Sequence, residues 1–132
     1  APQWRRHVCY LPTDSGWWAE VVGDHFSEPG HALDLLKKMR LPDDILTWPV
    51  ARLSTGEKQR LALTRVLLLA PKIFLLDEPT SGLDPDSTHV VEEMLQQRAA
   101  NGAAILFVTH DPGQSDRLAT RKLSLINGML VP

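Results

Sequence analysis

Two adjacent carboxylates, Asp77 and Glu78, directly follow an apolar segment of the chain. Residues 73–76 read Ile-Phe-Leu-Leu, which is typical of a buried strand. Mg²⁺ takes oxygen ligands and keeps several waters, so one carboxylate can lie near a metal while the other lies near an attacking water. An isolated pair of this kind can also do no more than end a strand. The pair therefore indicates a nucleotide-hydrolysing site only if other parts of such a site accompany it.

The loop that usually holds the phosphates of a nucleotide is absent from the sequence. Such a loop requires Gly, four residues, then Gly-Lys and Ser or Thr. None of the eight glycines of this 132-residue chain is followed by Lys; they lie at positions 16, 23, 30, 56, 82, 102, 113 and 128. The sequence therefore contains only half of an expected ATP site.

Two other positions can contribute to a phosphate site. Ser54 and Glu57 have the spacing of a capping box, which ties down amides at a helix start, and the same helix end can bind an anion. His110 follows the apolar run 103–108, so it is expected at the same sheet edge as Asp77 and Glu78. The remaining histidines, at positions 7, 25, 31 and 89, have no ligand spacing and are interpreted as surface residues.

Composition narrows the function classes. A hydrophobic content of 43% suits one globular domain or a large part of one, and a net charge of −2 gives no basic surface for nucleic acid. The single cysteine, Cys9, excludes an internal disulfide and fits a reducing compartment. The apolar run 66–70 is far shorter than the roughly 20 residues of a membrane helix. The start lacks Met and a signal-type segment, which predicts a chain cut from a longer protein.

The hydrophobic period predicts alternating strands and helices. Strands are expected over 7–11, 72–77 and 103–109, and helices over roughly 17–25, over 27–40 with Pro29 in the first turn, from Ser54 to before Pro71, and over 84–101. At most one helical turn is expected in 41–49, and Asn127-Gly128 predicts a hairpin. Strand, helix and strand in this order predict a parallel crossover unit in an α/β fold.

Four motifs occur in a fixed order: LSTGEKQR at 53–60, FLLDEP at 74–79, SGLD at 81–84 and VTHD at 108–111. Together they resemble the signature, Walker B, D-loop and switch-histidine motifs of the ATPase subunits of ABC transporters. The resemblance implies a P-loop NTPase-like α/β fold with a partial parallel sheet and the P-loop strand missing. It implies a core strand and Q-loop region at 1–13, a helical subdomain with the signature motif at 14–70, and a core half at 71–132.

The resemblance also implies roles toward ATP and Mg²⁺ for nine residues of these motifs and for Thr13 of the Q-loop region. Asp77 would hold Mg²⁺, Glu78 would polarise the hydrolytic water, and His110 would contact the γ-phosphate. The residues implied to contact ATP across a dimer are Ser54, Thr55, Gly56 and Glu57 of the signature motif, with Ser81 and Asp84 of the D-loop. Asp84 or Asp86 can instead simply cap the next helix.

The chain departs from the family pattern at two of these positions. Thr55 stands where the family usually has Gly, and its branched side chain hinders close approach of a phosphate. Thr13 stands where the family has the Q-loop Gln that touches Mg²⁺, and its oxygen reaches less far. The implied contacts are therefore weakest at these two threonines.

The implied partners are a second ATPase subunit, in a homo- or heterodimer, and a transmembrane permease subunit that docks on the helical subdomain. The implied location is cytoplasmic, on the inner face of the cell membrane. The short helical region resembles those of small subunits assigned to metal-ion export.

Two alternative functions stay open. One is a soluble non-transporter ABC ATPase, but such proteins usually carry an insertion near the signature motif, and residues 14–54 leave no room for it. The other is a non-enzymatic regulatory module. Adjacent Trp17 and Trp18 can lie at the docking surface or in the core.

The absent P-loop strand leads to two further expectations. Truncation is the simplest interpretation, and the chain alone should not hydrolyse ATP, because the main phosphate cradle is lacking. In the family's sheet this strand lies beside the strand that ends at His110, so its absence leaves an unpaired edge, and such edges recruit other strands. We expect either the hairpin at Asn127-Gly128 to pair with that edge or two chains to associate across it, with the 14–70 region native-like.

Overall fold

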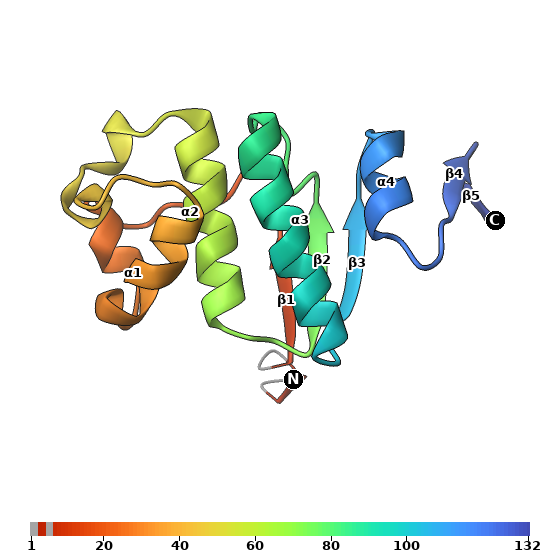
Figure 1. The fold of residues 1–132 in the computed structure, drawn as a ribbon, viewed down its shortest axis with the longest axis horizontal. Coiled ribbons are helices and arrows are strands. Elements are labelled where there is room, and N and C mark those ends of the chain that lie inside the picture. The colour runs from red at the N-terminus through yellow and green to blue at the C-terminus, as the bar shows by residue number, and fades with distance from the viewer. Residues whose placement is uncertain (1–2, 5–6) are drawn as a thin grey trace.

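The computed structural model describes residues 3–4 and 7–132. The described part contains a three-stranded parallel sheet in the order β1-β2-β3 and a separate two-stranded antiparallel sheet, β4-β5 (Figure 1). In chain order the elements are β1 (Val8–Leu11), η2 (Val22–His25), α1 (Pro29–Lys38), η3 (Ile45–Thr47), η4 (Val50–Arg52), α2 (Thr55–Leu68), β2 (Ile73–Asp77), α3 (Pro85–Ala100), β3 (Ala104–Val108), α4 (Pro112–Leu118), β4 (Ser124–Ile126) and β5 (Met129–Val131). The α/β class and the parallel crossover unit are as predicted.

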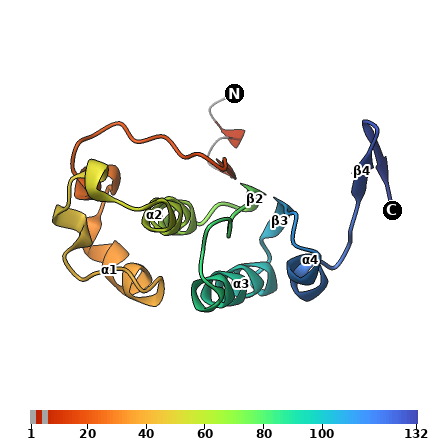
Figure 2. The ribbon, with the colours of Figure 1, turned by 90° about the horizontal axis from the view of Figure 1, so that it is seen from above.

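Successive side chains of each strand point to opposite faces of the sheet, and the two faces differ. Phe74 and Leu76 are buried, in register with Ile105 and Phe107 of β3. Helices α3 and α4 lie together on one side of the strands, whereas no helix of the described chain covers the other side (Figure 2). On that open face Leu106 is 63% exposed. The covered face thus supplies part of the core, and the open face is left without a layer.

The hydrophobic core joins the covered face of the sheet to the helical region. Its buried members come from β2, from helices α2 and α3, and from the short 3-10 helices η2 and η3. They include Val22, Ile45, Leu61, Leu63, Phe74, Val91 and Leu95. Pro29 occupies the first turn of α1, and α2 begins after Ser54, as the sequence predicts. The 14–70 region therefore shares its core with Phe74 of β2 and with Val91 and Leu95 of α3, and its native-like state remains a prediction.

The helix predicted over roughly 17–25 is wrong, because only the short 3-10 helix η2 forms there. The preceding backbone pairs with an extended segment instead: Val22 N–H donates to Trp48 O and Val50 N–H donates to Glu20 O. Gly23 also lies against Leu46, whose carbonyl oxygen would be 2.9 Å from a Cβ atom at that position. Local helical periodicity is overridden here by pairing with 48–50.

The C-terminal hairpin forms where predicted but not against the expected partner. Asn127 and Gly128 both have positive φ, of 50° and 79°, which suits a two-residue turn. The hairpin makes its own sheet, so its predicted pairing with the edge of β3 is wrong. Helix α4 follows β3 and precedes the hairpin along the chain (Figure 1). The sequence did not lead us to expect this helix. The other expectation, association of two chains, remains a prediction.

None of the helices formed by residues 3–4 and 7–132 has the length and apolar character needed to cross a bilayer.

Candidate functional site

The carboxyl end of β2 places Asp77 on the open face of the sheet. Tyr10 of β1 is in register with Leu75 and lies on the same face. Its hydroxyl donates a hydrogen bond to Asp77 Oδ2 over 3.4 Å. Sequence reasoning missed Tyr10, because its proximity depends on the strand register. Asp77 is thus an oriented, accessible oxygen ligand of the kind that suits Mg²⁺.

Glu78 adopts a strained backbone conformation directly after the strand. Its φ is +50°, which is uncommon for a residue with a side chain. The Glu78 N–H donates to Val108 O at the end of β3, and the Ser81 N–H donates to Glu78 O, both over 3.0 Å. Strained backbone of this kind concentrates at functional sites, where surrounding contacts maintain it.

The side chains of Glu78 and His110 meet at the sheet edge, as predicted. His110 Nε2 lies 3.4 Å from Glu78 Oε1, and the imidazole is 93% exposed while Glu78 is only 21% exposed. Glu78 Oε1 is buried, and no donor among the described residues bonds it in proper geometry. The pair therefore presents a sheltered carboxylate beside a ring that is open to a ligand. This arrangement can hold a water near the carboxylate and a phosphate near the imidazole.

The start of α2 forms the complete capping box. Glu57 N–H donates to Ser54 Oγ over 3.3 Å, while Ser54 N–H and Oγ–H donate to Glu57 Oε2 over 2.8 and 2.7 Å. The hydrogen bond from the Ser54 backbone is the main cause that lowers the pKa of Glu57. The structural interpretation of this motif is thus confirmed, and it leaves the helix end available to an anion as well.

The signature motif and the D-loop lie side by side in the same chain. A Cβ atom on Gly56 would be 3.4 Å from Gly82 O and 3.9 Å from Leu83 Cδ2, which is ordinary van der Waals contact between the two motifs. Thr55 is the first residue of α2 and Ser81 is exposed in the D-loop. The two motifs therefore form one continuous surface beside the sheet edge.

Asp84 caps α3. Ser87 N–H donates to Asp84 Oδ1 over 3.0 Å and Ser87 Oγ–H donates to Oδ2 over 2.6 Å, and these bonds lower the pKa of Asp84. Arg40, at the end of α1, donates to Asp86 over 2.9 Å and lies 3.9 Å from Asp84. The capping alternative is therefore confirmed for Asp84.

Thr13 lies exposed in the bend after β1. Its role toward Mg²⁺, which the resemblance implies, remains a prediction; the hydrogen bond to Asp77 comes from Tyr10. Among the described residues no three His, Cys, Asp or Glu side chains gather as a ready metal site. Any Mg²⁺ bound here would therefore take much of its shell from waters and from the nucleotide.

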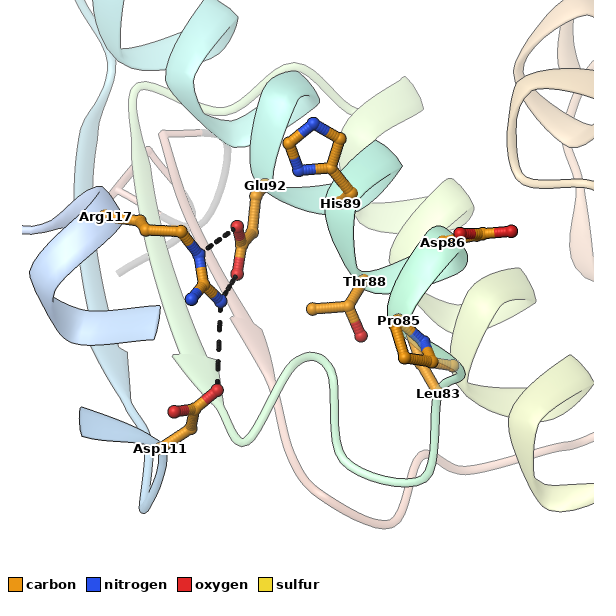
Figure 3. Close-up of a pocket in the computed structure, with 8 residues that line it drawn as sticks. All are labelled: Leu83, Pro85, Asp86, Thr88, His89, Glu92, Asp111 and Arg117. Carbon is orange, nitrogen blue, oxygen red and sulfur yellow. Dashed lines mark hydrogen bonds and ion pairs between the residues drawn. The ribbon is translucent and has the colours of Figure 1, made fainter. Parts of the chain in front are cut away.

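A polar network that the sequence did not reveal lies behind the D-loop. Arg117 of α4 donates two hydrogen bonds to Glu92 of α3, over 2.8 and 2.6 Å, and lies 3.8 Å from Asp111 (Figure 3). Arg117 and then Gln114 act on the Glu92 carboxyl and lower its pKa. Glu92, Asp111 and Arg117 line a surface hollow with Leu83 and Thr88, and the lining does not include Asp77, Glu78 or His110. The hollow is therefore adjacent to the candidate site and separate from it.

His25 was interpreted as a surface residue, and that interpretation is wrong. It is buried, with Nε2 3.2 Å from Ala19 O and its ring edge against Trp17 and Trp18. The Arg65 guanidinium lies over both indoles, 4.6 and 4.9 Å from their centroids, and desolvation lowers its pKa. Trp18 nevertheless remains 71% exposed. The cluster therefore holds one large aromatic side chain toward solvent.

Comparison with known proteins gives consistent matches. A family model described as ABC transporter matches residues 1–81. The probable iron export ATP-binding protein FetA of Escherichia coli (strain K12) is 48% identical over 119 residues, which cover 82% of this chain and 53% of that protein. The glutamine transport ATP-binding protein GlnQ of the same strain is 37% identical over 99 residues, covering 75% of this chain and 41% of that protein. The chain thus spans about half the length of the curated relatives it matches.

Two solved structures share the fold. One is described as the structure of an ATP binding subunit of an ABC transporter. It matches with a TM-score of 0.76 at 30% identity, and the match covers 88% of this chain and 53% of that chain. The other is a dimeric ATP-binding cassette in a post-hydrolysis state bound to ADP and Pi, with a TM-score of 0.75 at 22% identity, and covers 88% of this chain and 58% of its own.

Proposed function

Because this chain belongs to the ABC transporter ATP-binding family, we propose that it forms part of a subunit that binds and hydrolyses ATP to power transport across a membrane. The observation that carries the proposal is the 3.4 Å approach of His110 to Glu78 at the carboxyl edge of the sheet, next to Asp77. Two separate motifs, 74–79 and 108–111, converge there. A strand that merely ends in carboxylates would not require the histidine.

Each of the three residues has a distinct role in the proposed mechanism. Bound Mg²⁺ would neutralise charge that develops on the phosphates, and Asp77 supplies an oxygen toward its shell. Glu78 accepts a hydrogen bond from the attacking water and orients it. His110 contacts the γ-phosphate from the solvent side, where its ring is exposed. The low exposure of Glu78 keeps its carboxylate out of bulk water, which strengthens its hold on the single water it orients.

A second ATPase subunit completes the proposed site. The start of α2 carries Ser54, Thr55, Gly56 and Glu57, and the helix dipole there favours a phosphate of ATP bound by the partner. Ser81 reaches toward the same partner from the adjoining D-loop, whereas the Asp84 carboxylate caps α3 in its own chain. The close packing of Gly56 on Gly82 supports a single dimer surface made by both motifs.

The bare side of the sheet supports a further part of the proposal. The edge of β3 and the exposed side chains Tyr10, Leu106 and Val108 form an apolar surface. In the intact subunit the strand and phosphate loop of the family would cover this surface and supply the main ATP contacts. The partial coverage of the relatives is consistent with that arrangement.

The permease subunit is proposed to dock on the helical region 14–70, with Trp18 as an exposed anchor held by Arg65 and His25. The complex would lie on the cytoplasmic face of the cell membrane. Metal-ion export is favoured as the process, because the relative named a probable iron export protein is 48% identical whereas the glutamine transport relative is 37% identical.

Replacing Glu78 by Gln in the intact subunit tests this function. We expect ATP turnover to be abolished and ATP binding to remain, because the amide keeps the size of the side chain and loses its role toward water. Phosphate release and nucleotide binding are measured on the same preparation, with Glu93→Gln on the exposed side of α3 as the matched control. Normal turnover in Glu78→Gln would reject the assigned role.

A further inference from the structure

Two glutamines from different helices reach the same three-residue segment, Glu78–Thr80. Gln59 of α2 is buried, and its Nε2 lies 3.3 Å from both Glu78 O and Pro79 O, to which it donates. Gln114 of α4 is fully buried, and its Nε2 donates to Thr80 Oγ1 over 2.8 Å. The segment is thus held from two sides by neutral amide donors.

This segment needs to be held because Glu78 has an unfavourable backbone conformation. With φ at +50°, a residue that carries a side chain relaxes unless its neighbours prevent it. Two backbone hydrogen bonds hold Glu78: its N–H donates to Val108 O, and its carbonyl oxygen accepts from Ser81 N–H. Gln59 fixes the carbonyl of the same residue, so the peptide planes before and after Glu78 Cα are both restrained.

Gln114 is itself fixed by a buried network. Its Nε2 lies 3.3 Å from Glu92 Oε1. Glu92 in turn accepts the two hydrogen bonds from Arg117 (Figure 3). Arg117 also lies 3.8 Å from Asp111, which caps α4 directly after His110. The element that carries His110 is therefore tied to the element that restrains Thr80.

The geometry of Gln114 points beyond simple stabilisation. Its Oε1 is buried, and no hydrogen-bond donor of the described chain reaches it. A buried amide with one orphaned atom costs free energy, so packing alone would favour an apolar side chain of the same size. What the amide adds over such a side chain is a link between Thr80 Oγ1, at 2.8 Å, and Glu92 Oε1, at 3.3 Å.

We propose that Gln59 and Gln114 are positioning residues that hold Glu78 against His110 in the hydrolytic geometry. This inference rests on the proposed function and deepens it. Gln59 acts on the catalytic residue directly, and Gln114 acts through Thr80. Neither side chain contacts the nucleotide.

The test uses the intact subunit with Gln59→Met, Gln114→Met and Thr80→Val, which keep volume and remove the hydrogen bonds. We expect kcat to fall about tenfold in each, with KM for ATP within about twofold of wild type, because small displacements affect the chemical step more than binding. The double variant Gln59→Met, Gln114→Met should lose less than the product of the single losses, because both act on one segment. Gln97→Met, on an exposed position of α3, is the matched control and should be unchanged.

Amide hydrogen exchange on the same proteins separates this inference from the proposed function. Exchange across 78–83 should accelerate in the three variants, whereas β1 and α3 should exchange as in wild type. Faster local exchange in a subunit whose wild type hydrolyses no ATP would support the restraint and reject the proposed function. Unchanged exchange, or a loss confined to KM, would overturn the positioning role. A fall in kcat accompanied by equally faster amide exchange in all helices and strands would overturn it too, because the variant would then have lost stability as a whole.

Discussion

The two faces of the parallel sheet are built from the same three strands but differ in how far their side chains are exposed. On the covered face Phe74 and Leu76 are buried under helices, and on the open face Leu106 and Val108 are 63% and 54% exposed. Apart from Asp77, the residues of β2 and β3 are apolar on both faces, so the difference in exposure comes from the layer above each face. Asp77, the proposed metal ligand, lies on this open face, where no helix of the described chain covers the sheet.

A matched pair of leucines tests this comparison and carries the largest expected effect. Leu76→Ala should lower the free energy of unfolding of the chain by about 2 to 5 kcal/mol, because it leaves a cavity on the covered face. Leu106→Ala, which makes the same chemical change on the open face, should stay within about 0.5 kcal/mol. Urea unfolding followed by circular dichroism measures both.

The same pair sharpens the comparison in the intact subunit. If another layer covers the open face there, Leu106→Ala should become as costly as Leu76→Ala. Equal and small effects of Leu106→Ala in the chain and in the intact subunit would contradict the proposed layer.

The second prediction concerns the network behind the D-loop, which belongs to the covered side. Glu92→Ala should cost about 1 to 3 kcal/mol, because it leaves Gln114 and Arg117 without their carboxylate partner. Arg117→Ala should cost less than Glu92→Ala does, since the Arg117 side chain is half-exposed and its loss leaves Gln114 bonded to Glu92. Chemical unfolding of the two variants at neutral pH gives the comparison, and a larger loss for Arg117→Ala would contradict it.

The pH dependence of this network has a definite sign. The pKa of Glu92 is lowered in the folded state, chiefly by Arg117, so its stabilisation is fully present above the unfolded-state pKa of about 4.3. The stabilisation is lost as pH falls through the lower folded-state value. Glu57 and Asp84 shift in the same direction. The free energy of unfolding of wild type should therefore fall from pH 5 downward more steeply than that of Glu92→Gln, and parallel pH profiles would contradict this assignment.

Ser54→Ala is the third change and should cost about 1 kcal/mol, because it removes an N-cap hydroxyl of α2. Thr47→Ala provides a control, since Thr47 Oγ1 donates only to Asp44 O beside the short η3. Thermal unfolding should show the larger decrease for Ser54→Ala. Equal shifts would mean that the capping box contributes nothing specific.

Features that depend on near neighbours could be predicted from the sequence, and those that depend on distant pairing could not. The capping box at Ser54, the strand before Asp77 and the turn at Asn127 are local, and all three are confirmed. Tyr10 reaches Asp77 only through the strand register, across 67 residues of sequence. Gln59 looked like an ordinary polar position on a helix, because nothing in the sequence marks a buried amide. The helix expected near Trp17 was lost to pairing with 48–50.

The C-terminal hairpin provides the smallest expected effect and the sharpest contrast with the covered face. Its strands pair only with each other, and Leu125, Met129 and Leu130 are exposed. An isolated two-stranded hairpin is marginally stable by itself, so it contributes little to the rest of the chain. Removing residues 123–132 should therefore change the free energy of unfolding by less than about 0.5 kcal/mol. If the hairpin instead paired with β3 in solution, the deletion would expose that edge and lower stability by several kcal/mol, since buried ladder bonds and apolar contacts would both be lost. Amide exchange in 104–108, measured with and without the hairpin, distinguishes the two cases. Unchanged protection agrees with the separate β4-β5 sheet. Lost protection would mean that the hairpin pairs with β3.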